Sequence, residues 1–173
     1  MRRVACLLLL AGLVACERTQ VTLHAPDQLP ESLADWGLMH ADGSYLSLHE
    51  SVHPYALNTP LFSDYALKLR TIWLPEGKQA AFREHGPLDF PVGTIISKTF
   101  FYEKAPDFGP NRFAVLKTGS AALPESDPGL DLERYVLLET RLLVRYDDGW
   151  KAIPYVWNRA QDSAQLAIAG DVI

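Results

Sequence analysis

Hydrophobic and polar residues alternate along much of the second half of this chain, which is the pattern of half-buried β-strands. The alternation predicts strands at residues 67–74, 80–83, 94–102 and 113–118. The segment 94–102 is the strongest of these, because β-branched and aromatic residues follow the turn sequence Pro91-Val92-Gly93. The following segment, residues 119–131, is rich in turn-forming residues and is predicted to form a polar loop.

The clearest local prediction is a β-hairpin over residues 135–157. Asp148-Gly149 is a preferred two-residue hairpin turn, and it would place Leu142 opposite Tyr155. Because side chains alternate between the two faces of a strand, one face should be apolar and aromatic: Leu142, Val144, Tyr146, Ile153, Tyr155 and Trp157. The other face mixes arginines with apolar residues and is expected to be half covered: Arg141, Leu143, Arg145 and Val156.

One short helix is predicted near the N-terminus, over residues 30–38. Pro30 suits a first helical turn, and Gly37 can end the helix. Leu33 and Trp36 lie three residues apart and therefore share a face. Many short strands with little helix indicate a mainly β fold, either an antiparallel β-sandwich or a jelly-roll-like barrel, with this single short helix.

The first residues form a leader rather than part of the fold. Arg2 and Arg3 precede an apolar stretch that ends at Ala15, which is typical of a secretory signal and is shorter than the roughly 20 apolar residues of a membrane-spanning helix. Cys16 follows Leu13-Val14-Ala15, an arrangement that resembles a bacterial lipobox, although an ordinary signal with an incidental cysteine is the alternative. We therefore expect a signal peptide at residues 1–15, a polar tether at 16–28 and a single β-rich domain at 29–173.

The resemblance to a lipobox implies that Cys16 is lipidated and anchors the chain to a membrane in the periplasm. Glu17 follows the anchor, where bacterial lipoproteins retained at the inner membrane often have aspartate. This analogy favours the outer membrane.

Charge and cysteine content narrow the function further. With Arg2 and Arg3 in the leader, 14 basic residues face 21 acidic ones, a net charge of −7. This balance, with no basic run, excludes a nucleic-acid-binding surface of the usual kind and leaves membrane attachment to the lipid. Cys6 leaves with the leader, so the domain contains no disulfide and no Cys-x-x-Cys-His haem motif, and we expect no cofactor.

The sharpest catalytic motif is His49-Glu50-Ser51-Val52-His53, a His-Glu-x-x-His sequence. On a helix this spacing places two imidazoles on one face to hold Zn²⁺, while the glutamate activates the bound water. Pro54 follows directly and disfavours a helix there, and His85 is the only later histidine that is available as a third ligand. A solvated loop with two exposed histidines is the alternative, and we expect no metal site.

Two further features have both a functional and a structural interpretation. Lys98 shares a strand face with Ile96, Phe100 and Tyr102, so it should pair, for example with Asp64, or reach water. The aromatic residues of the predicted strands could form a sugar-binding platform or belong to the core: Trp73, Trp150, Tyr155 and Trp157.

Several longer blocks resemble a known family: residues 54–65, 68–75, 90–100, 139–144 and 154–158. Together they are similar to the N-terminal module of a family of bacterial secreted or lipid-anchored proteins, described as di-haem c-type cytochromes or as conserved proteins partnered with a parallel β-helix protein. Members carry Cys-x-x-Cys-His segments after this module, and this sequence contains none. The haem-binding part is therefore absent here.

The resemblance implies a lipid-anchored accessory or interaction module for a c-type cytochrome or another redox partner, with no catalysis of its own. Two alternatives remain open at this point. One is a carbohydrate or small-ligand binding module that uses the aromatics, and the other is a zinc metallohydrolase built on His49, Glu50 and His53.

Overall fold

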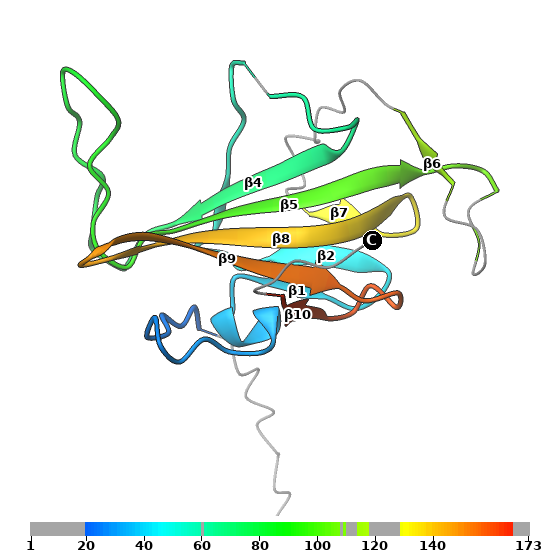
Figure 1. Ribbon diagram of the computed structural model, residues 1–173, viewed down its shortest axis with the longest axis horizontal. Coiled ribbons are helices and arrows are strands. Elements are labelled where there is room, and N and C mark those ends of the chain that lie inside the picture. Colours follow the sequence, from blue (N-terminus) through cyan, green and yellow to red (C-terminus); the bar gives the residue numbers. More distant parts are fainter. Residues whose placement is uncertain (1–19, 60, 108, 110–113, 118–128, 168–173) are drawn as a thin grey trace, which may run out of the picture.

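The computed structural model describes residues 20–59, 61–107, 109, 114–117 and 129–167, and within them two antiparallel sheets face each other (Figure 1). The larger sheet has the strand order β10-β9-β8-β5-β4-β3, with β6 paired to β5, and the smaller sheet has the order β1-β2-β7. The elements are η1 (Leu33–Trp36), β1 (Met39–Ala41), β2 (Tyr45–Leu48), β3 (His53–Pro54), β4 (Leu67–Trp73), β5 (Ile95–Lys104), β6 (Val115–Leu116), β7 (Leu130–Asp131), β8 (Tyr135–Tyr146), β9 (Gly149–Trp157) and β10 (Ala164–Leu166). The sheets do not close into a barrel, so the mainly β prediction is confirmed in its sandwich-like form.

The predicted hairpin is formed by β8 and β9, with a register that differs from the expected one by two residues. Tyr146 pairs with Gly149, and Leu142 pairs with Ile153 rather than with Tyr155. The turn residues are Asp147 and Asp148, and the positive φ of 133° falls on Gly149, just after the turn. Because strand side chains repeat every two residues, a shift of two leaves every side chain on its predicted face.

The inner face of the large sheet forms most of the core. All six residues predicted for the apolar face of the hairpin are buried. The same layer contains a row of buried polar side chains, in which Thr71 Oγ1 lies 2.6 Å from Ser97 Oγ and Thr99 Oγ1 lies 2.8 Å from Thr140 Oγ1. The Trp157 indole N–H also donates to Thr140 Oγ1, at 2.9 Å. These groups satisfy one another and therefore avoid the cost of burying unpaired polar atoms.

A β-bulge interrupts the pairing of β8 with β5 and is completed by a side chain from elsewhere. Phe100 pairs with Glu139 while the next residue, Phe101, pairs with Leu137, so β8 carries one extra residue. The Gln161 amide reaches the main chain of Leu137: its Oε1 accepts from the Leu137 N–H at 2.5 Å, and its Nε2 donates to the Leu137 carbonyl at 3.2 Å. The Gln161 side chain thus supplies the hydrogen-bond partners that a neighbouring strand would otherwise give to Leu137.

The N-terminal helix is a single 3-10 turn, shorter than the predicted 30–38. Ser32 caps its start, where the Oγ accepts from the Ala34 N–H, and Gly37 ends it in the left-handed conformation at φ 66°. Leu33 and Trp36 are both buried, as predicted. A Cβ on Gly37 would lie 2.3 Å from the Gln20 carbonyl oxygen, so both backbone conformation and space require glycine here.

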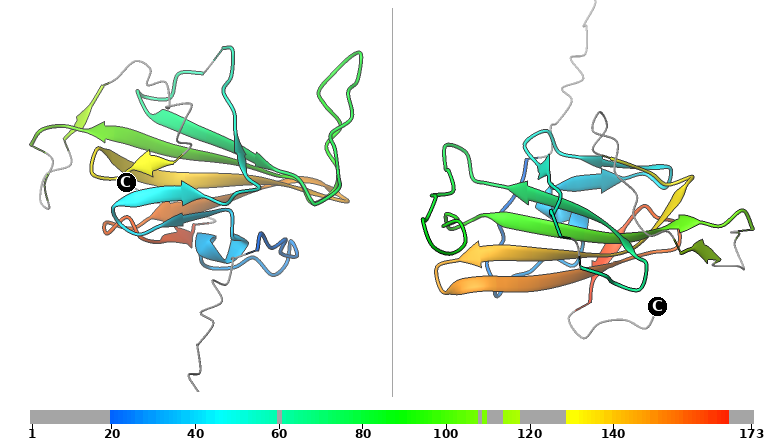
Figure 2. Two further views of the ribbon diagram at one scale, coloured as in Figure 1. Left: turned by 180° about the vertical axis from the view of Figure 1, so that it is seen from behind. Right: turned by 90° about the horizontal axis from the view of Figure 1, so that it is seen from above.

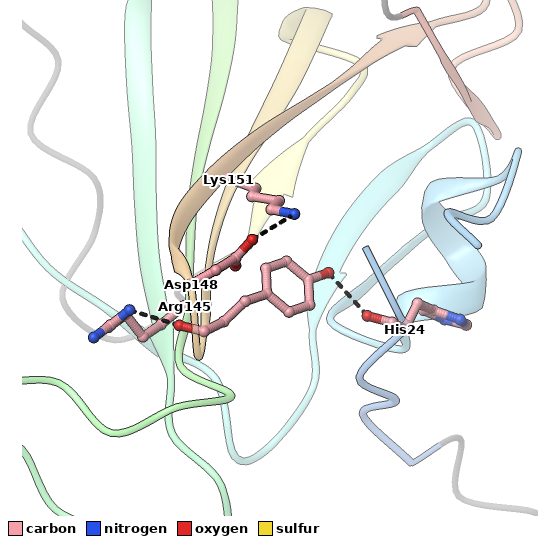
Figure 3. A network of polar contacts seen from close by, with 5 residues as sticks. His24, Arg145, Asp148 and Lys151 are labelled. Atoms are coloured by element: carbon pink, nitrogen blue, oxygen red, sulfur yellow. Dashed lines mark hydrogen bonds and ion pairs between the residues drawn. The ribbon is translucent and has the colours of Figure 1, made fainter. Parts of the chain in front are cut away.

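The segment before the helix packs against the inner side of the large sheet. The Tyr155 hydroxyl accepts from the Trp36 indole at 2.7 Å and donates to the Pro30 carbonyl at 2.9 Å. The Tyr146 hydroxyl donates to the His24 carbonyl at 2.8 Å (Figure 3). Residues 20–28, which the sequence assigns to the tether, therefore contact the fold in this region.

The small sheet was not predicted, because its strands are short and lie between turn formers. Asp42 closes the β1–β2 turn: its Oδ1 accepts from the main-chain N–H groups of Ser44 and Tyr45, each at 2.8 Å, and from the Ser44 hydroxyl. These hydrogen bonds, the Ser44 hydroxyl first, lower the pKa of the Asp42 carboxyl to about 2. The third strand, β7, begins after Gly129, where a Cβ would lie 2.5 Å from the Leu46 carbonyl oxygen.

Candidate functional site

The outer face of the large sheet is the most distinctive surface in the described part of the chain, and we call it the open face. Cross-strand pairing arranges its residues in three rows across β4, β5, β8 and β9. The first row is apolar and consists of Ile72, Ile96, Leu143 and Ala152. The second row carries the cations and consists of Arg70, Lys98, Arg141 and Pro154. The third row is mixed and consists of Lys68, Phe100, Glu139 and Val156. Figure 2 (right) looks onto this side of the sheet.

Three cations lie next to one another on neighbouring strands, and we call Arg70, Lys98 and Arg141 the cationic row. Partial burial, then the positive charges of Arg141 and Arg70, lower the pKa of the Lys98 ammonium, while Glu139 opposes them. Burial also lowers the pKa of Lys68, followed by the charges of Arg70 and Lys98. The fold thus keeps these cations close together although their positive charges repel one another.

The neighbours of the row position these cations but neutralise only one of them. Arg141 forms an ion pair with Glu139 and lies 5.1 Å from the centre of the Phe100 ring. The Lys98 ammonium lies 4.9 Å from the same ring. Within the residues that the structure describes, neither Arg70 nor Lys98 has an ion-pair partner. Within the described residues, the cationic row therefore presents two cations without an ion-pair partner and one paired cation, and Lys68 lies beside them on the same face.

Residues 55–59 and 61–66 form one side of the open face and expose large apolar side chains. Leu61 is 77% exposed and Phe62 is 70% exposed. Side-chain and main-chain bonds tie the segment to the sheet. Lys68 Nζ donates to the Leu61 carbonyl at 2.9 Å, the Tyr102 hydroxyl donates to the Asp64 carbonyl at 2.8 Å, and the Tyr55 N–H donates to the Arg70 carbonyl at 2.9 Å. Asp64 and Tyr65 both have positive φ, at 44° and 65°, so the backbone here is strained.

The connection between β4 and β5, residues 74–94, rises from the same side of the sheet (Figure 1). Its tip exposes Phe82 to 82%. At its base, Phe90 packs edge-on against Trp150 of β9, with ring centres 5.9 Å apart. Ala81 and Asp89 form an isolated bridge in place of the strand predicted at 80–83. Apolar side chains therefore flank the cationic row at two margins of the face.

The prediction for Lys98 is resolved by this arrangement. Its side chain shares a strand face with Ile96 and Phe100, as expected, and this face is the outer face of the large sheet. No ion pair joins it to Asp64 among the described residues. The nearest charged neighbours are Arg70 and Arg141, which the sequence separates from Lys98 by long stretches of chain, so that only the strand order brings the three together.

The four aromatic residues considered as a platform do not share a surface. Tyr155 and Trp157 are buried in the core, and Trp73 is partly buried against it. Trp150 is 39% exposed and lies at the margin of the open face. The structural interpretation therefore holds for Tyr155 and Trp157.

The His-Glu-x-x-His motif does not lie on a helix. His49 begins a turn, in which its carbonyl accepts from the Val52 N–H, and its Nδ1 lies 2.8 Å from the Ser51 hydroxyl. His53 starts β3 and is exposed. His49 and Glu50 line a hollow of about 380 Å³ that His53 does not line. Across the described ranges, no three His, Cys, Asp or Glu side chains form a group that could hold a metal ion.

Cys16, the predicted lipidation site, lies outside the described residues. In the part that is described, no helix is long and apolar enough to cross a membrane. Comparison with protein-family models, with curated proteins and with solved structures finds no match.

Proposed function

We propose that this protein is a lipid-anchored interaction module of the periplasm that docks a redox partner, a c-type cytochrome, and performs no catalysis itself. The cationic row on an otherwise half-apolar open face is the observation that carries the proposal. The chain has an excess of acidic residues, yet three cations stand side by side in one row of this sheet face. Such a surface is suited to an oppositely charged partner.

The composition of the open face also supports docking. Leu143, at its centre, is 37% exposed, and apolar residues of two long connections flank it. Exposed apolar side chains grouped with arginines are typical of protein interfaces. The similarity of five sequence blocks to cytochrome-associated modules supports a haem protein as the partner, and the lipobox-like Leu13-Val14-Ala15-Cys16 supports the anchor.

Site-specific crosslinking tests this proposal in native membranes. A photo-reactive residue at Leu143 should capture a partner that stains for covalent haem. The matched control is the same residue at Glu31, which is exposed near η1 on the other side of the sheet. Equal capture from both positions, or none from Leu143, would refute docking on the open face. A captured band without haem would support docking on the open face but refute a c-type cytochrome as the partner.

A further inference from the structure

We propose that the cationic row binds carboxylate side chains of an acidic protein segment, presented from the side opposite the membrane anchor. This inference rests on the proposed function, because it names the chemistry of the partner at the same face. It is carried by two independent observations, the charges of the row and the position of the chain that follows Cys16.

The row has the geometry of a carboxylate receptor. Neighbouring strands lie about 4.8 Å apart, so three cations on adjacent strands span about 10 Å, enough for two carboxylates side by side. Arg70 offers a planar guanidinium that can hold a carboxylate through two parallel hydrogen bonds. Lys98 adds a point charge beside it, held against Phe100.

The pairing of Glu139 with Arg141 shows that a carboxylate fits beside the cationic row. This carboxylate, on the same face, already pairs with Arg141, and its side chain is mostly covered. It leaves Arg70 and Lys98 without an anion in the described part of the chain. A segment with two or more acidic side chains would complete the pairing that Glu139 begins. It would also relieve the repulsion by Arg141 and Arg70 that, after burial, lowers the pKa of Lys98.

The placement of the N-terminal segment indicates that the open face points away from the anchoring membrane, and this favours a protein over a lipid as its ligand. Gln20 lies against Gly37 at the end of η1, and the inner-face residues Tyr146 and Tyr155 bond His24 and Pro30. Residues 20–30 therefore run along the inner side of the large sheet. Cys16 is four residues before Gln20, a reach of at most about 14 Å. The lipid would hold the inner side toward the membrane and turn the open face away from anionic headgroups.

Calorimetric titration of the lipidated full chain in mild detergent tests the inference. The probe is an oligoglutamate peptide, and glycerol phosphate, the headgroup chemistry of an anionic lipid, is titrated separately. The double variant Arg70→Gln/Lys98→Gln should bind the peptide about tenfold more weakly than wild type. The matched control, Lys78→Gln/Lys151→Gln, removes the same charge elsewhere and should stay within about twofold of wild type. Raising the salt from about 20 mM to about 150 mM should weaken wild-type binding.

A charge-reversed variant tests whether the weaker binding of the double variant is caused only by loss of folding. Arg70→Glu/Lys98→Glu should lose oligoglutamate and bind oligolysine instead. Equal weakening in the test and control variants would overturn the inference. So would row-dependent binding of glycerol phosphate without binding of the peptide, which would assign the row to lipid. A wild-type chain that captures a haem protein through Leu143 but ignores oligoglutamate would refute the carboxylate chemistry and leave the proposed function intact.

Discussion

At the scale of single residues, the sequence predicts which strand face Lys98 lies on, but it does not predict which side chains surround it. The alternation of residues 94–102 places it on one strand face with Ile96 and Phe100, and the structure agrees; that this face is the outer one follows from the fold. Its neighbours Arg70 and Arg141 belong to strands far apart in the sequence. Which strands flank β5, and in what register, depends on tertiary packing that local pattern does not contain.

Replacing Lys98 with Met should raise the free energy of unfolding at pH 7. The substitution removes the cost of partly burying the ammonium, which is the main cause of the lowered Lys98 pKa, and also the repulsion by Arg141 and Arg70, while an apolar side chain is kept. We expect a gain of up to about 1 kcal/mol at low salt. A folded-state pKa below 10.5 means that the folded protein loses this proton first. The cost is therefore present at neutral pH and fades as the pH rises from the lowered value toward 10.5.

Urea unfolding followed by circular dichroism at pH 7 and at pH 10 measures this gain. Lys78→Met, at an exposed position off the row, serves as the control and should show no gain. A variant that is less stable than wild type at pH 7 would contradict a strained row. A stabilised variant that also binds oligoglutamate less well would show that the row is kept for binding, at a cost in stability.

At the scale of elements, the sequence predicts which residues are inside better than it predicts which residues are partners. The β8–β9 hairpin differs in register by two residues, yet all six expected inner residues are buried. The apolar pattern constrains the face of a strand but not a shift by one full period. The sequence does not predict the short strands β1, β2 and β10 for a related reason, because three or four residues cannot establish a period.

The bulge in β8 gives a prediction at this scale. Gln161→Ala should lower the free energy of unfolding by about 1–3 kcal/mol, because the buried N–H and carbonyl of Leu137 lose their partners. Hydrogen exchange of the Leu137 amide should quicken in the variant, while global unfolding is measured by urea titration. Gln165→Ala, at an exposed position of β10, is the matched control and should change stability by less than about 0.5 kcal/mol. Unchanged exchange at Leu137 would show that the bulge is closed by other means.

At the scale of the whole molecule, the large sheet separates two environments. The small sheet, η1 and residues 20–32 lie on its inner side (Figure 1). That side also carries the core, while the outer side carries the cationic row and two connections with exposed apolar side chains. The sequence indicated a half-covered outer face for the hairpin. It did not indicate that the N-terminal segment and the open face would lie on opposite sides, since this depends on how residues 20–36 pack on Tyr146 and Tyr155.

The predicted anchor gives the corresponding test. Cys16→Ala should move the protein from the membrane fraction to the soluble periplasm and abolish palmitate labelling, because the acidic domain has little electrostatic attraction to anionic lipid. Fractionation with an antibody against the domain measures the distribution, and Cys6→Ala, inside the leader, is the control that should stay in the membrane fraction. Retention of the Cys16 variant in membranes would assign attachment to the protein surface.

The position of Trp150 has an optical consequence. Trp36 and Trp157 are buried and Trp73 is partly buried against the core, whereas Trp150 is 39% exposed beside Phe90 at the margin of the open face. An indole that passes from water into a contact emits at shorter wavelength and is shielded from aqueous quenchers. The molecule therefore carries its own fluorescent probe at the surface where a partner would arrive, and acrylamide quenching of the unlabelled protein would report occupancy of that surface directly.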